Sequence, residues 1–121
     1  RAFIRASARD AVSSSAIDPR FVVSPVRALA NKGTRRFVEK QREVIARFDR
    51  GEIDQLTAQL EIEHFWAGAL RRAVVDGDVE TGSVMAGQSV GMVTKIQPAR
   101  EILEELVAQA TATLAKRSLS G

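Results

Sequence analysis

The apolar residues of this chain recur mainly at the three- and four-residue spacing of an α-helix, and this periodicity constrains the fold more than any other feature. The clearest case begins at Pro98, a residue favoured in the first turn of a helix. Lys116 and Arg117 lie toward its negative C-terminal end. We expect its apolar residues to face inward: Ile102, Leu103, Leu106, Val107, Ala110 and Leu114.

A second helix is predicted between Thr34 and Gly51. Thr34 is a good N-cap residue, and Gly51 is a typical stop because glycine readily adopts the left-handed conformation that ends many helices. The expected apolar face of this helix consists of Phe37, Val38, Val44, Ile45 and Phe48.

A third helical region starts near Asp54, where we expect Ile53, Leu56 and Leu60 along one buried stripe. Gly68 can divide the region into two helices, and Gly77 can end the later one. Its later part carries six apolar residues, which are Phe65, Trp66, Ala69, Leu70, Ala73 and Val74.

Residues 1–33 are less regular because serines, prolines and a glycine interrupt them. Between Pro19 and Pro25, the run Phe21–Val23 predicts a brief strand or an extended segment. The whole chain therefore reads as mostly α-helical, with four or five helices and little strand. That is an unusual inventory for a free-standing α/β enzyme.

Composition narrows the class of protein further. The chain has 121 residues, of which 45% are hydrophobic and 27% charged, as expected of one globular domain. It has no cysteine, which excludes disulfides and thiolate zinc sites and suits a reducing cytoplasm. No apolar run approaches the roughly 18 residues of a membrane span. We expect a cytoplasmic protein that does not cross a membrane.

Basic residues concentrate in the first fifty positions. Over the whole chain, however, 18 lysines and arginines are offset by 15 acidic residues, which leaves a formal charge of +3. The asymmetry can mark a surface that meets phosphate or an acidic partner. A solvated helix face accounts for it more simply, so nucleic-acid binding is the less favoured interpretation.

Four of the eight glycines lie between Gly77 and Gly91. Within this stretch, residues 82–89 fit the phosphate-loop pattern G-x-x-x-x-G-K-[ST], except that Gln88 replaces the lysine. Three carboxylates just before it would repel a polyphosphate, so we expect no nucleotide site. The spacing Gly87-x-x-x-Gly91 instead suits close packing against a flat ligand or another backbone.

The single histidine lies in Glu61-x-x-His64, a spacing that gives two ligands to the di-iron site of ferritin-like bundles. Such a site needs a second motif and further carboxylates, so we expect no metal here. Nothing in the sequence pairs a serine with His64 as a nucleophilic triad requires. Phe65 and Trp66 are expected as core or interface aromatics. Residue pattern alone thus reveals no catalytic set.

One long segment nevertheless resembles a known family. Residues 68–91, with Ile96, Pro98 and Glu101 after them, are similar to the C-terminal signature of the nitronate monooxygenase (nitropropane dioxygenase) family, which includes flavin-dependent enoyl-acyl carrier protein reductases. Upstream, the element Pro25-x-Arg27-x-Leu29-x-Asn31 is similar to a second family element in the same order.

The resemblance implies an α/β fold for the complete family member, an FMN-binding (β/α)8 barrel. Residues 1–24 would form an irregular segment, in which Phe3–Ser7 would follow the flavin-phosphate loop; Arg1 stands where that loop has threonine. Residues 25–75 would be a helical cover, and residues 76–121 the glycine-glutamine segment with the closing barrel helix. The start at Arg1 fits a fragment or a processed piece.

The resemblance also implies a site. The family's catalytic histidine lies in an earlier motif that His64 does not match, so the catalytic residues are expected outside this chain. Met85, Gly87, Gln88 and Gly91 are the candidates beside flavin or substrate, with helix packing at the barrel end as the competing interpretation. Implied co-substrates are NAD(P)H and either a nitronate or an enoyl thioester. The remainder of the barrel, or a partner chain, would complete the enzyme.

A different class of function stays open beside this one. The chain could be a non-catalytic helical module whose arginine-rich first half binds an acidic partner or RNA.

Overall fold

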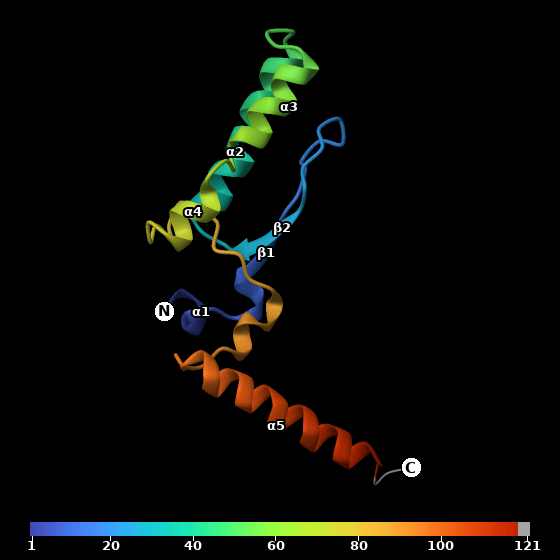
Figure 1. The fold of residues 1–121 in the computed structure, drawn as a ribbon. Coiled ribbons are helices and arrows are strands. Elements are labelled where there is room, and N and C mark those ends of the chain that lie inside the picture. Colours follow the sequence, from blue (N-terminus) through green and yellow to red (C-terminus); the bar gives the residue numbers. More distant parts are fainter. Residues whose placement is uncertain (119–121) are drawn as a thin grey trace.

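The computed structural model describes residues 1–118 and is 56% helical with one two-stranded sheet, which confirms the mostly helical fold. Two lobes and a projecting C-terminal helix make up the molecule (Figure 1). The last three residues of the segment predicted for 76–121 lie outside the described part. The elements in order are α1 (Ala2–Arg5), η1 (Ala8–Asp10), β1 (Ala11–Ser14), β2 (Val26–Leu29), α2 (Lys32–Asp49), α3 (Gln55–His64), α4 (Ala69–Val74), η2 (Gln88–Met92) and α5 (Ala99–Ser118).

Helix α2 begins three residues earlier than its sequence suggested. Asn31, not Thr34, is the N-cap: its side chain accepts a hydrogen bond from the Thr34 N–H at 3.0 Å. Thr34 completes a capping box, since its hydroxyl accepts from the Asn31 N–H at 3.0 Å. The expected stop at Gly51 is confirmed, because this glycine follows the C-cap with a φ of 73°.

Helix α3 lies antiparallel beside α2 but presents a different face from the one predicted. Ala58 and Ile62 are buried against the core, whereas Leu56 and Leu60 are 67% and 43% exposed. The predicted stripe was therefore wrong for Leu56 and Leu60, whereas Ile53 is partly buried and packs against the main core. The small Ala58, fully buried, lets the two helices approach closely, and the bulkier leucines lie outside that contact.

The main core lies between α2, α3 and the segment that precedes β2. Phe21 is buried and meets Phe48 edge-on, with ring centroids 5.4 Å apart. The run Phe21–Val23 belongs to neither strand, and Phe21 lies at a bend of the chain. The core cluster consists of Phe21, Phe37, Val44, Ala58 and Ile62.

A second, smaller cluster surrounds the sheet. Strands β1 and β2 pair antiparallel, with Ala11 opposite Leu29 and Ser14 opposite Val26. The isolated bridge between Ala28 and Met85 extends this pairing to the glycine-rich segment. The cluster consists of Ala11, Leu29, Val84 and Val90.

Gly68 separates α3 from α4, as the sequence allowed: it has a φ of 71° and caps the N-terminus of α4. Helix α5 lies at the far end of the molecule from α2 and α3 (Figure 1). Its apolar residues do not face inward within the described chain; Leu103 and Leu106 are 63% and 58% exposed. No described helix combines the length and apolarity needed to cross a membrane.

Candidate functional site

The two sequence elements that carry the family resemblance pack directly on one another. Asn31 Nδ2 donates to the backbone carbonyls of Val79 and Gly82, at 2.9 and 2.8 Å. The Leu29 N–H donates to the Val84 carbonyl at 2.9 Å, next to these bonds. The element 25–31 and the glycine-rich segment therefore form one structural unit.

Gly82, the first glycine of the near phosphate-loop pattern, makes room for helix α4. A Cβ at this position would lie 2.6 Å from the Ala73 nitrogen and 2.6 Å from the Asp78 carbonyl oxygen. The next residue, Ser83, donates its N–H to the Ala69 carbonyl at 2.9 Å. Close packing, and not a phosphate, explains this glycine.

Gly87, Gln88 and Gly91 lie at the short helix η2 and differ in their surroundings. A Cβ on Gly91 would lie 3.0 Å from the Ala8 nitrogen, so the absence of a side chain here lets the N-terminal segment of the chain pack closely. A Cβ on Gly87 would meet only the Ser89 hydroxyl oxygen, at 3.7 Å. Gln88 is exposed, and its amide bonds to no other described residue. Gly87 and Gln88 are therefore open to a group from outside this segment.

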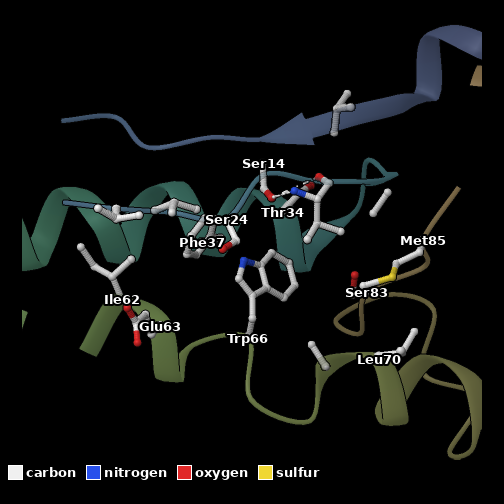
Figure 2. Close-up of a pocket in the computed structure, with 16 residues that line it drawn as sticks. Ser14, Ser24, Thr34, Phe37, Ile62, Glu63, Trp66, Leu70, Ser83 and Met85 are labelled. Atoms are coloured by element: carbon white, nitrogen blue, oxygen red, sulfur yellow. Dashed lines mark hydrogen bonds between the residues drawn. The ribbon is translucent and has the colours of Figure 1, made fainter. Parts of the chain in front are cut away.

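Met85, the fourth predicted residue, lines a cavity of about 270 Å³ between the sheet and helices α2 to α4. Figure 2 shows the Trp66 ring projecting into the middle of this cavity. The lining is mainly apolar, and Glu63 is its one charged residue. Other apolar contributors come from the four elements β1, β2, α3 and α4: Val12, Val26, Ala28, Ile62 and Leu70.

Trp66 belongs to an aromatic cluster, as its neighbourhood in the sequence suggested. Its ring centroid lies 5.2 Å from that of Phe37 and 5.2 Å from that of Phe65. Its Nε1 is the one buried side-chain nitrogen or oxygen within residues 1–117 that has no hydrogen-bond partner. The indole N–H is thus a fixed donor at the cavity.

Glu61 is paired with two basic side chains of α2. The Glu61 carboxylate accepts from Lys40 at 3.1 Å and from Arg47 at 2.8 Å. These bonds hold the pKa of Glu61 below its ordinary value. The carboxylate links α3 to α2, and His64 is exposed at the end of α3.

Sequence reasoning missed the cavity itself. Ser24, Ala28 and Ser83 lie on its wall, and none of them belongs to a pattern that marks a binding site. Only Met85 and the bulk of Trp66 gave any local signal, because a cavity between five segments is defined by long-range packing.

A search of solved structures found FabK from Thermotoga maritima. It is 31% identical to this chain, and the structures match with a TM-score of 0.68 over 96% of this chain and 32% of FabK. A FabK mutant from the same organism is 28% identical, with a TM-score of 0.63 over 96% of this chain and 29% of the mutant. No family model and no curated protein matches the chain.

The chain thus spans about a third of the length of these FabK structures. FabK is a TIM-barrel, flavin-dependent enoyl-acyl carrier protein reductase, and a mostly helical piece with one small sheet fits a part of that fold. In sequence and in structure, this chain resembles the C-terminal portion of the flavin-dependent enoyl reductases of the nitronate monooxygenase-like family, as its motifs predicted.

Proposed function

We propose that this chain is the C-terminal portion of an FMN-dependent oxidoreductase that reduces an enoyl thioester with NAD(P)H. The observation that carries the proposal is the match to FabK, at 31% identity and a TM-score of 0.68 over 96% of the chain. In the complete enzyme, residues 25–75 would cover the flavin, and the segment that begins at residue 76 would return the chain to the barrel. The cysteine-free composition suits the cytoplasm as its location.

The residues at η2 fit a place beside the flavin only in part. Gly87 leaves its backbone open, and the exposed Gln88 amide can both donate and accept without bringing charge. The space beside Gly91 is occupied instead by the backbone of Ala8. When bound, FMN would supply hydride transfer, and Gln88 would help to hold it in position.

The cavity supports the thioester over the nitronate as substrate. Its wall combines valine, alanine, isoleucine and leucine side chains with Met85, and it has no lysine or arginine among its described lining residues. An apolar acyl chain gains free energy by leaving water there. A nitronate is an anion and would find no countercharge, while Glu63 would repel it.

The remainder of a barrel is the partner that this chain requires. Its apolar residues on α5 are exposed in the described structure, and barrel helices bury such residues on the strands. The same need would be met by a partner chain that supplies the strands.

A hybrid enzyme tests the proposed function. This chain would replace the matching 32% of Thermotoga maritima FabK, and flavin content and NAD(P)H-dependent reduction of an enoyl thioester would be measured. FabK that lacks the same segment is the control. We expect the hybrid to retain flavin and activity and the truncated control to lose both. A folded hybrid without flavin would reject the proposal.

The alternative function, a basic module for an acidic partner or RNA, gains little from the structure. Arg20 is paired with Asp18 at 2.6 Å and with Asp49 at 2.8 Å. Lys40 and Arg47 are both paired with Glu61. The first half therefore presents less free positive charge than its composition suggests.

A further inference from the structure

We propose that the Trp66 indole N–H donates a hydrogen bond to the carbonyl oxygen of an acyl group held in the apolar cavity. The inference deepens the proposed function and rests on it for the identity of the acyl group as a thioester. It assigns a specificity-determining role to a residue that no sequence motif marked.

The Trp66 donor has no acceptor within the described chain. Trp66 Nε1 is buried and has no partner among the described residues, whereas other buried side-chain polar groups, such as the Gln41 amide, are bonded. An indole N–H can only donate. Because a buried donor without an acceptor costs free energy, a ligand that brings an oxygen to it gains affinity.

Two aromatic neighbours hold the Trp66 ring in a fixed position. Phe37 packs on it at an interplanar angle of 50°, and Phe65 meets it edge-on at 88°. Both neighbours restrict the ring, so its N–H direction is set before a ligand arrives. Figure 2 shows the nitrogen directed toward the side of the cavity that contains Ser24. A preset donor loses little freedom on binding.

The chemistry of the cavity wall selects an uncharged acceptor. The exposed Glu63 is the one charged residue among the lining, and its carboxylate accepts from Gln59 at 2.6 Å. A carboxylate or nitronate ligand would lose its hydrating water in the cavity and find no cation to replace it, which costs free energy. A thioester carbonyl carries the required oxygen without charge, and its alkyl chain suits the apolar residues around Met85.

The chain offers a direct spectroscopic test, because Trp66 is its only tryptophan. The full 121-residue chain, labelled with ¹⁵N, should give one indole N–H signal. It would be titrated with S-(2-hexenoyl)-N-acetylcysteamine and with the matching thioether, in which CH₂ replaces the carbonyl. We expect the thioester to shift the indole proton downfield and to bind about tenfold more tightly than the thioether.

Two variants sharpen the test. Trp66→Phe keeps the aromatic packing and removes the donor, so ligand-observed NMR should show equal affinities for thioester and thioether. Ser24→Leu places a larger apolar side chain at the exposed rim of the cavity and should weaken both ligands together. The same measurements would be repeated on the FabK hybrid.

Four results would overturn the inference. Equal affinities of the wild-type chain for thioester and thioether would show that no hydrogen bond to the carbonyl forms. If neither ligand binds to the chain or to the hybrid, the cavity is not an acyl-binding site. Tighter binding of a hexyl nitronate than of the thioester would contradict the selection against anions. An indole signal that moves in ligand-free Ser24→Ala would show that Ser24 is already the acceptor.

The two proposals can fail separately. A hybrid that holds flavin and reduces the thioester, but shows no preference for the carbonyl, would reject only the role of Trp66. A chain that binds the thioester through Trp66, in a hybrid without flavin, would reject only the enzymatic function.

Discussion

Asn31 and Gly82 are joined by a hydrogen bond of 2.8 Å from the Asn31 side-chain amide to the Gly82 carbonyl. The same amide group reaches Val79, and the oxygen of that side chain caps helix α2. One side chain therefore performs two tasks: it starts a helix and fastens the glycine-rich segment to it.

Asn31→Ala should lower the free energy of unfolding by about 2–3 kcal/mol. Loss of the cap costs about 1 kcal/mol, and the carbonyls of Val79 and Gly82 lose a donor, the second of them in a partly buried position. Asn31→Asp keeps a capping oxygen but not the amide donor, so it should fall between alanine and wild type. Urea unfolding at one protein concentration checks the order, and equal midpoints for all three proteins would contradict it.

Gly82→Ala should destabilise the chain by about 1–3 kcal/mol, because its Cβ would overlap the backbone of Ala73. Gly87→Ala is the matched control in the same segment. Its Cβ meets one hydroxyl oxygen at 3.7 Å and should change stability by less than about 0.5 kcal/mol. Thermal unfolding of both variants compares them, and a Gly87 variant as unstable as the Gly82 variant would refute the packing argument.

Acid should destabilise the fold through Glu61 and Asp78. Hydrogen bonds from Lys40 and then Arg47 lower the pKa of Glu61, and the Thr81 hydroxyl lowers the pKa of Asp78. A lowered pKa contributes stability above the unfolded-state pKa, about 4, and that stability is lost as the pH falls through the folded-state pKa. Unfolding midpoints should therefore decrease below about pH 4.

Glu61→Gln provides the control for this acid dependence. The variant should lower stability at pH 7 and flatten the decline below about pH 4, because one of the shifted groups is gone. A pH profile parallel to that of the wild type would show that Glu61 does not contribute.

The isolated chain should associate through α5. Leu103 and Leu106 are exposed on this helix, which lies away from the main core. Leu103→Glu and Leu106→Glu should reduce self-association in sedimentation velocity while urea stability changes by less than about 0.5 kcal/mol. In the FabK hybrid the same changes should prevent assembly. A wild-type chain that stays monomeric at high concentration would count against this surface.

Gln88→Ala should leave the stability of the chain unchanged, since the exposed amide bonds to no described residue. In the hybrid it should reduce flavin retention or kcat/KM by about tenfold, equivalent to one hydrogen bond of about 1.4 kcal/mol. Flavin absorbance and steady-state kinetics measure both. Unchanged values would favour helix packing as the role of the segment.

The sequence predicted the helices better than their faces. Asp54 and Gly68 mark real boundaries, but apolar residues occur on more than one side of α3, and periodicity alone could not choose between Leu60 and Ile62. The choice depends on how closely α3 approaches α2, which the small side chain of Ala58 decides. A local pattern does not contain that long-range distance.

The strands and the cavity were beyond local reasoning for a related reason. Strand β1 contains Ser13 and Ser14 and becomes a strand through its pairing with β2, not through its own propensity. Family motifs did identify the element at Asn31 and the glycine-rich segment. Their mutual contact, and the unpaired donor of Trp66, required the three-dimensional arrangement.

The bond between Asn31 and Gly82 also has a kinetic meaning, because it joins residues 51 positions apart. Helices α2 and α3 meet through a short connection, so their pairing closes a small loop. Joining the glycine-rich segment to Asn31 closes a much longer one, at a greater cost in chain entropy. The helical pair should therefore form first during folding, and the segment that carries Met85 and Gln88 should be the last part of the site to assemble.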